Sequence, residues 1–293
     1  MKVYIDGKFY DEDKAKISVF DHGLLYGDGI FEGIRAYHGK VFKLKEHIER
    51  LYYSAKAILL TIPMTPAQMT KAVLDTCRKN KISDGYIRLV VTRGVGTLGL
   101  NPNRCKAPSV IVIVGKIQLY PPELYARGMD IVTVATTRNL HNAVNPAIKS
   151  LNYLNNILAK IEANAAGADD ALMLDAHGFI AETNATNVFL IMSGAVLTPI
   201  ADGCLPGITR AKVIAMCRAH GIPVAEQRLT VQQALDADEM FVTGTLGELT
   251  PVATLDSKLI GGEGAPARGP LTGRLQRLYG ELTASEGTLI PDA

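Results

Sequence analysis

The sequence predicts an α+β protein of two domains. The chain has 293 residues, which exceeds the length of a typical single domain, and its 47% hydrophobic composition is sufficient for buried cores. Short runs rich in β-branched residues alternate with stretches of helical periodicity on both sides of an irregular segment that contains Pro121 and Pro122. We therefore expect a small N-terminal α/β domain over 1–115, an interdomain linker over 116–128 and a larger C-terminal domain over 129–293.

Strands and two amphipathic helices are predicted in the N-terminal domain. Apolar residues recur at i, i+3 and i+4 along 45–60, and a second stripe of this kind follows Pro66, a residue favoured at the first position of a helix. The dipeptides DG at 6–7 and HG at 38–39 are typical of turns. The predicted strands lie near Val3 and Phe9 and at 29–37, 40–44, 86–92 and 109–114.

Glycine-containing turns separate the predicted elements of the C-terminal domain. A helix over 150–166 ends at Gly167 and another over 209–220 ends at Gly221, because glycine readily adopts the left-handed conformation that closes a helix. The remaining predicted elements are a strand at 130–135, hairpins at 175–178 and 193–194, and a last strand near 239–243.

Charge and cysteine patterns argue against several classes of protein. The 31 basic and 29 acidic residues give a net charge of +2, which leaves no excess for a nucleic-acid surface. The N-terminus turns polar after two or three apolar residues, and no apolar run approaches the roughly 18 residues that cross a bilayer, so we expect a cytoplasmic protein. Cysteine spacing argues against a metal site or a disulfide framework at Cys77, Cys105, Cys204 and Cys217.

Two residues have the chemistry that pyridoxal phosphate enzymes require. Lys149 precedes an amphipathic stretch in PAIKSLNYLNN, and Glu182 lies at the end of a predicted strand in FIAETN. A lysine amine can react with the cofactor aldehyde, and a carboxylate can hold the ring nitrogen protonated. Both residues also have ordinary interpretations: Lys149 as a solvated lysine at a helix start, and Glu182 as a surface carboxylate.

Two glycine-containing segments are candidates for phosphate binding. GVGTLG at 94–99 matches the dinucleotide fingerprint and follows a strand, but Asn101-Pro102-Asn103 stands where the fingerprint needs a helix, so a nicotinamide oxidoreductase is disfavoured. LPGITR at 205–210 is the better anion site, because backbone N–H groups at a helix start, the Thr209 hydroxyl and the helix dipole can converge on a phosphate. Simple helix capping by Thr209 is the alternative.

Six sequence blocks, in order along the chain, resemble the branched-chain amino-acid aminotransferases. They are FEGIRAY at Phe31, HIERL at His47, YIRLVVTRG at Tyr86, IKSLNYLNN at Ile148, LPGITR at Leu205 and TGTLGELTPV at Thr243. From Tyr4 to about Thr283 the chain resembles a two-domain, fold-type IV aminotransferase with the D-amino-acid aminotransferase-like fold. The resemblance implies pyridoxal 5'-phosphate as cofactor and amino transfer between L-leucine, L-isoleucine or L-valine and 2-oxoglutarate, giving branched-chain 2-oxo acids and L-glutamate.

The same resemblance implies roles for single residues. Lys149 would bind the cofactor aldehyde and then move a proton as general acid and base, while Glu182 would contact the ring nitrogen. Tyr153, expected one helical turn after Lys149 on the same helix face, would contact the ring hydroxyl. The implied phosphate-binding residues are Arg50, Ile208, Thr209 and Thr245. The implied substrate-binding residues are Tyr26, Phe31, Gly33, Arg35, Tyr86, Arg88, Leu98, Leu100, Thr245 and Leu246. Leu98 and Leu100 would reach the active site of a neighbouring subunit.

The sequence also departs from part of this family. It has the shorter KSLNY form after Ile148, Thr183-Asn184 stand where many relatives have a glycine-containing pair, and TLGEL at 245–249 replaces a form with smaller residues. A D-amino-acid aminotransferase, an aminodeoxychorismate lyase and a cofactor carrier without turnover therefore stay as alternatives. The expected partners are small amino and 2-oxo acids and further copies of the chain, as a homodimer or higher homo-oligomer, with no nucleic acid, membrane or metal.

Overall fold

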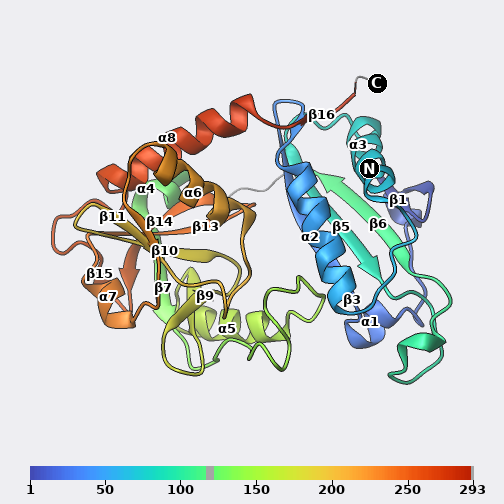
Figure 1. Ribbon diagram of the computed structural model, residues 1–293, viewed down its shortest axis with the longest axis horizontal. Coiled ribbons are helices and arrows are strands. Elements are labelled where there is room, and N and C mark those ends of the chain that lie inside the picture. Colours follow the sequence, from blue (N-terminus) through green and yellow to red (C-terminus); the bar gives the residue numbers. More distant parts are fainter. Residues whose placement is uncertain (117–121, 292–293) are drawn as a thin grey trace. The chain divides into compact units, whose positions relative to one another are not determined.

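The computed structural model describes residues 1–116 and 122–291, and the chain forms two compact units. The first unit consists of Met1–Gln118, Ile148–Asn152 and Thr283–Ala293, and the second of Leu119–Ala147 and Tyr153–Leu282 (Figure 1). The short stretch that contains Lys149 therefore belongs to the first unit, although segments of the second unit flank it in sequence. Residues 117–121, inside the predicted linker, lie outside the described residues.

An antiparallel seven-stranded sheet forms the centre of the first unit, with the order β16-β4-β3-β5-β6-β1-β2. Its strands are β1 (Lys2–Ile5), β2 (Lys8–Asp11), β3 (Gly29–Tyr37), β4 (Lys40–Val41), β5 (Gly85–Thr92), β6 (Ser109–Gly115) and β16 (Thr288–Leu289). The predictions for β3, β5 and β6 are confirmed to within one residue. The strand predicted at 40–44 is shorter, because a helix begins at Leu44.

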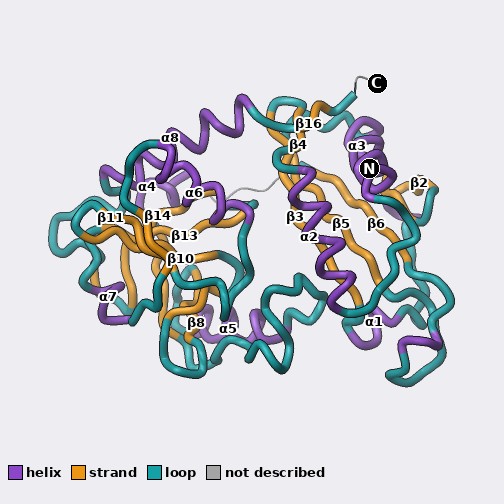
Figure 2. The backbone as a smooth tube through the Cα atoms, viewed as in Figure 1, coloured by secondary structure: helices purple, strands orange, loops and turns teal. Residues whose placement is uncertain are grey.

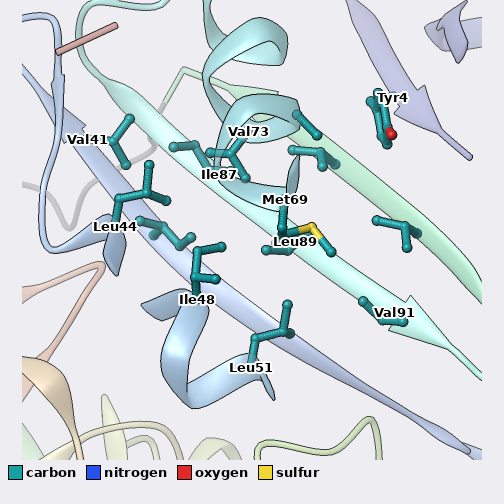
Figure 3. Close-up of a cluster of buried hydrophobic side chains, with 14 of the residues drawn as sticks. Tyr4, Val41, Leu44, Ile48, Leu51, Met69, Val73, Ile87, Leu89 and Val91 are labelled. Atoms are coloured by element: carbon teal, nitrogen blue, oxygen red, sulfur yellow. The ribbon is translucent and has the colours of Figure 1, made fainter. Parts of the chain in front are cut away.

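Two helices, α2 (Leu44–Ala57) and α3 (Pro66–Lys79), pack on this sheet. α3 begins at Pro66 as predicted, and a capping box of Thr65 and Gln68 satisfies backbone groups at its start. Figure 3 shows aliphatic side chains of both helices meeting those of β5. The labelled members of this core are Tyr4, Val41, Leu44, Ile48, Leu51, Met69, Val73, Ile87, Leu89 and Val91. The unit also contains α1 (His22–Tyr26) and the short 3₁₀ turns η1 (Glu12–Lys14) and η2 (Pro102–Arg104).

A mixed nine-stranded sheet forms the core of the second unit (Figure 2). Its order is β12-β11-β10-β13-β14-β7-β8-β9, and β15 pairs with β14. The strands are β7 (Met129–Thr133), β8 (Asp170–Leu174), β9 (Ile180–Thr183), β10 (Asn187–Met192), β11 (Ala195–Thr198), β12 (Val224–Glu226), β13 (Glu239–Gly244), β14 (Glu248–Leu255) and β15 (Lys258–Leu259). The hairpins predicted at 175–178 and 193–194 are confirmed, since these turns join β8 to β9 and β10 to β11.

The C-terminal part of the chain differs from its prediction. The strand at 239–243 is not the last one, because β14, β15 and β16 follow it. An interior proline argues against a strand, yet β14 contains Pro251, next to a shift in its pairing with β7. The helices are α4 (Pro122–Arg127), α5 (Leu154–Ala165), α6 (Ile208–Ala219), α7 (Val231–Leu235) and α8 (Pro270–Ser285). Of these, α4, α7 and α8 were not predicted, and α4 lies inside the predicted linker. No helix in the described ranges is long and apolar enough to cross a bilayer.

A buried carboxyl group, Asp170 at the start of β8, gives a pH-dependent stability prediction. Burial raises the pKa of Asp170 to about 6 from its usual 3.8. The Ala171 N–H donates a hydrogen bond of 2.9 Å to Asp170 Oδ1, which lowers the pKa but does not cancel the effect of burial. The folded state therefore holds this proton more tightly, and stability from this group is lost as the pH rises from about 4 to 6.

We expect Asp170→Asn to raise the free energy of unfolding at neutral pH by about 2 to 3 kcal/mol, because the amide carries no charge to desolvate. Urea denaturation of both proteins across this pH range measures the effect. The gain should shrink toward acidic pH, where the wild-type carboxyl is already protonated. A difference that does not vary with pH would contradict the assigned cause.

Candidate active site

Lys149 lies in an extended segment held to β3, not on a helix. Ser150 forms an isolated antiparallel bridge with Ile30, and the Phe31 N–H donates a hydrogen bond of 2.9 Å to the Lys149 carbonyl. The Lys149 N–H donates to Ser54 Oγ on α2 at 3.2 Å. The prediction that Lys149 opens a helix is therefore wrong, because these backbone groups bond to other elements and not to the next helical turn.

Tyr153 occupies the N-cap position of α5, with φ −100° and ψ 10°. The residues between it and Lys149 are not helical, so the prediction that Tyr153 and Lys149 share a helix face is wrong. Tyr153 belongs to the second unit and Lys149 to the first. Its contact with a ring hydroxyl stays a prediction.

The Lys149 side chain is grouped with three of the predicted substrate-binding residues. Its Nζ lies 4.5 Å from the ring centroid of Phe31. The Arg88 guanidinium carbon lies 4.5 Å from the same centroid and 5.4 Å from that of Tyr86. These distances are typical of cation–π contacts. The structure thus brings an amine, a guanidinium and two aromatic rings together on β3, β5 and the Lys149 segment.

Gly33 is required where β3 passes Tyr86. Gly33 pairs with Arg88 of β5, and a Cβ atom at position 33 would overlap the Tyr86 hydroxyl. Glycine therefore lets the phenol lie directly on the β3 backbone. Arg35, two residues further along β3, is buried and stacks its guanidinium on the Tyr37 ring at 4.4 Å.

Arg50 is oriented by a buried ion pair that sequence analysis missed. Its Nε and Nη2 atoms donate hydrogen bonds of 2.7 Å to the two carboxylate oxygens of Glu32 on β3. His47 Nδ1 lies 2.7 Å from Glu32 Oε2. Burial favours the neutral acid, but attraction to Arg50 and His47 outweighs it and lowers the pKa of Glu32 to about 2. Glu32 lies in the FEGIRAY block and His47 in the HIERL block, and this position inside two of the resembling blocks is the sequence signal that could have indicated them.

The loop at 94–100 is bound to α1. Tyr26 Oη accepts a hydrogen bond of 2.9 Å from the Gly99 N–H, and His22 Nε2 lies 2.9 Å from the Thr97 carbonyl oxygen. Leu98 and Leu100 are 66% and 80% exposed, so they pack little within their own chain. The 3₁₀ turn η2 follows this loop, so the α-helix that a dinucleotide fingerprint needs does not begin there.

Glu182 is a buried carboxylate with a guanidinium partner. It lies on β9 and is 4% exposed, so its interpretation as a surface residue is wrong. Arg138 Nε donates a hydrogen bond of 2.7 Å to Glu182 Oε1, and the Leu205 N–H donates one of 3.3 Å to Oε2. Arg138 Nη1 also donates to Asn155 Oδ1 on α5 at 2.8 Å. Sequence analysis missed Arg138, because it stands in a loop outside every quoted block.

The start of α6 lies close to Glu182 and has no side-chain cap. Gly207 is its N-cap residue, and Thr209 is the second helical residue, so capping by Thr209 is wrong as an alternative. Asn187 Nδ2 lies 3.5 Å from Glu182 Oε2 and donates to the Leu205 carbonyl at 2.9 Å. A Cβ at Gly207 would overlap Asn187 Oδ1. The helix therefore presents N–H groups and the positive end of its dipole near this carboxylate.

Thr245 and Leu246 lie in the turn that joins β13 to β14. A Cβ built at Gly244 would lie 3.1 Å from Thr186 Cγ2, which places the end of β13 beside the turn that follows Glu182. Thr243 Oγ1 is buried and has no hydrogen-bond partner in the described part of the chain. The second unit thus gathers the predicted residues Glu182, Ile208, Thr209 and Thr245 around the ends of β9, β13 and α6.

A family model described as amino-transferase class IV matches residues 29–255, which is well over half of the chain. The chain belongs to the class IV aminotransferases. The matched range contains Lys149, Glu182 and every other candidate site residue except Tyr26. This match confirms the fold-type IV resemblance.

Several relatives of this class IV aminotransferase are named as branched-chain amino acid aminotransferases. The putative branched-chain-amino-acid aminotransferase of Methanocaldococcus jannaschii is 47% identical over the full length of both chains. The solved branched-chain amino acid aminotransferase of Escherichia coli is 33% identical, with a TM-score of 0.92 over 96% of this chain and 94% of that one. The T.th. branched-chain amino acid aminotransferase, solved with pyridoxamine 5'-phosphate, is 37% identical, with a TM-score of 0.92 over 96% and 93%. The predicted α+β fold class is confirmed.

Proposed function

We propose that this class IV aminotransferase uses pyridoxal 5'-phosphate to transfer the amino group of L-leucine, L-isoleucine or L-valine to 2-oxoglutarate, giving branched-chain 2-oxo acids and L-glutamate. The observation that carries the proposal is the grouping of the Lys149 amine with Phe31, Arg88 and Tyr86. It offers a reactive amine, an apolar surface for an aliphatic side chain and a cation for a carboxylate. The names of the relatives support branched-chain amino acids as the amino donors.

The residues present fit this cofactor. Lys149 supplies a primary amine, Glu182 a buried carboxylate, and the start of α6 a set of N–H groups without a side-chain cap. The unpartnered Thr243 hydroxyl adds a buried donor beside the β13–β14 turn. When bound, pyridoxal 5'-phosphate supplies an electrophilic aldehyde and a ring that accepts electrons.

Lys149 and Glu182 divide the proton chemistry between them. Lys149 would hold the aldehyde through its primary amine and would move the proton at the substrate Cα as general acid and base. Glu182 would hold the ring nitrogen. The Arg138 guanidinium, which donates a hydrogen bond of 2.7 Å to Glu182 Oε1, places a positive charge beside this buried carboxyl group. Tyr153 is the proposed donor to the ring hydroxyl.

A cofactor phosphate would be held by backbone donors at the start of α6, where the N–H groups of Ile208 and Thr209 and the helix dipole would attract the dianion. The resemblance assigns the Thr245 hydroxyl and the Arg50 guanidinium to the same phosphate. Glu32 offsets part of the Arg50 charge and holds the planar group in one orientation, which favours directed hydrogen bonds over a diffuse cation.

Substrate selection depends on an apolar surface for the side chain and on donors that bind carboxylates. Tyr26, Phe31 and the leucines of the 94–100 loop favour aliphatic side chains, at about 0.8 kcal/mol for each buried CH₂. Carboxylates are bound by Arg88 and Tyr86, with N–H groups after Thr245 as further donors. Gly33 keeps room for the Tyr86 hydroxyl. Arg35 is the candidate for a second carboxylate, that of the glutamate side chain.

We also infer a homodimer. The 94–100 loop is held in place by Tyr26 and His22, yet its two leucines point into solvent in a single chain. Such an ordered loop with exposed apolar side chains is suited to entering a neighbouring subunit. Leu98 and Leu100 would then line the partner's substrate pocket.

Absorption spectroscopy and an amino-transfer assay test this function together. The purified, reconstituted protein should show a visible or near-ultraviolet band that shifts on adding L-leucine, because the amino group moves onto the cofactor. Adding 2-oxoglutarate should restore the band and release L-glutamate. A shift with D-alanine and none with any L-amino acid would favour the D-specific enzyme. Breakdown of aminodeoxychorismate without amino transfer would favour the lyase.

A further inference from the structure

A cavity of about 670 Å³ lies within the first unit. None of the residues proposed above to bind cofactor or substrate lines it. Its lining comes from residues 4–7, 16–18, 21, 63–64, 94–95 and 106–110. This volume is typical of sites that bind small molecules.

The backbone holds the walls of this cavity in place. The Lys106 N–H donates a hydrogen bond of 3.3 Å to the Val95 carbonyl, and Val95 forms an antiparallel bridge with Asp21. A Cβ atom at Gly94 would overlap the Ala107 carbonyl oxygen, so the two ends of the β5–β6 loop meet there. The cavity is therefore formed by the fold before any ligand binds.

Both carboxylates of the lining are bonded to donors of the fold. Asp6 accepts hydrogen bonds from the Val110 N–H at 2.6 Å and from the Ser109 hydroxyl at 2.9 Å. Asp21 is buried and accepts the Thr92 hydroxyl at 2.8 Å and a backbone N–H of α1 at 2.7 Å. These acids are therefore satisfied without a cation from a ligand.

Both amines of the lining lack such partners. Lys16 and Lys106 are exposed, and within residues 1–116 and 122–291 neither ammonium group has a hydrogen bond or an ion pair. Apolar surface lies in the same cavity at Ile17, Met64 and Pro108. A ligand that matches both features carries an anionic group and an aliphatic body.

We propose that this cavity binds a small aliphatic carboxylate, with the anionic group at Lys16 and Lys106 and the hydrocarbon part against the apolar wall. An inorganic anion would leave that wall in water, and each CH₂ buried there contributes to affinity. The site uses neither Lys149 nor Arg88. The inference goes beyond the proposed function and does not depend on it.

The cavity adjoins the segments that hold the 94–100 loop. Asp21 in its lining is the N-cap residue of α1, the helix that contains Tyr26. Tyr26 Oη in turn accepts the Gly99 N–H. Val95, also in the lining, belongs to the loop itself. An occupant should therefore slow hydrogen exchange in this loop as well as in the cavity walls.

Hydrogen exchange of the holoenzyme, followed by mass spectrometry, locates the site. The probe is 3-methylbutanoate, an aliphatic carboxylate that has no amine or oxo group to react. At saturation it should slow exchange about tenfold in 16–21 and 106–110. Lys16→Glu/Lys106→Glu should abolish this protection, because two carboxylates would repel the ligand. Lys8→Glu/Lys81→Glu, with the same charge change at exposed lysines outside the cavity, should retain it.

Protection confined to 148–152, or equal protection in the Lys16→Glu/Lys106→Glu variant, would overturn the proposal. Acetate keeps the charge but lacks the aliphatic body, so it should need a concentration about tenfold higher or more. Equal half-saturating concentrations for acetate and 3-methylbutanoate would also refute it. 4-Methyl-2-oxopentanoate and L-leucine, each added alone so that amino transfer cannot complete a cycle, distinguish an oxo acid from an amino acid as the source of the carboxylate. Amino-transfer activity of the same samples reports separately on the proposed function.

Discussion

Replacing Lys149 with alanine is expected to lower kcat for amino transfer by about 10⁴-fold or more, because no amine remains to bind the aldehyde or carry the Cα proton. The fold should survive, since the segment is held through the Lys149 N–H and carbonyl, which alanine retains. Steady-state kinetics, the absorption spectrum and the thermal unfolding temperature measure the three consequences.

Lys149→Arg is the matched control for charge. It keeps a cation next to the Phe31 ring but offers no primary amine, so it should be as inactive as the alanine variant. Together the two variants separate the loss of the primary amine from the loss of the positive charge at position 149. Activity within tenfold of wild type in Lys149→Ala, or an unchanged visible band, would mean that another residue binds the cofactor.

Replacing Arg138 with methionine should destabilise the protein by about 3 to 5 kcal/mol, because Glu182 would remain buried without this guanidinium. Urea denaturation of the cofactor-free protein measures the loss. Glu182→Gln in the Arg138→Met background should recover much of it, since a neutral amide costs less to bury than a carboxylate. Stability thus depends on the pair more than on either residue alone.

The double-mutant cycle of these two substitutions provides the control. The interaction free energy between positions 138 and 182 should exceed about 1 kcal/mol, as expected for residues in direct contact. Arg138→Lys should lie between wild type and methionine, because lysine keeps the charge but not the planar fork that reaches both Glu182 and Asn155. Additive effects would show that the ion pair contributes nothing to stability.

Local patterns predicted much of the fold correctly. β3, β5, β6 and α3 follow from short-range signals: β-branched runs, a helical stripe and a proline at the first position of a helix. Such signals failed where distant segments compete for the same backbone. Residues 150–153 have a helical pattern, but β3 and α2 bind the backbone of Lys149, Ser150 and Leu151, so α5 starts only at Leu154. β14 was missed because its proline is tolerated beside an irregular pairing.

The sequence by itself determined the chemistry that is available: an amine at 149, a carboxylate at 182 and a glycine-initiated helix at 207, because these depend on residue type and short-range order. Only the tertiary structure decided which charges meet. Glu32 lies on β3 and Arg50 on α2, and Arg138 is 44 residues from Glu182. Burial decides such pairs, since a charge removed from water must find its counter-ion wherever the packed chain places one, and no local pattern encodes that distance.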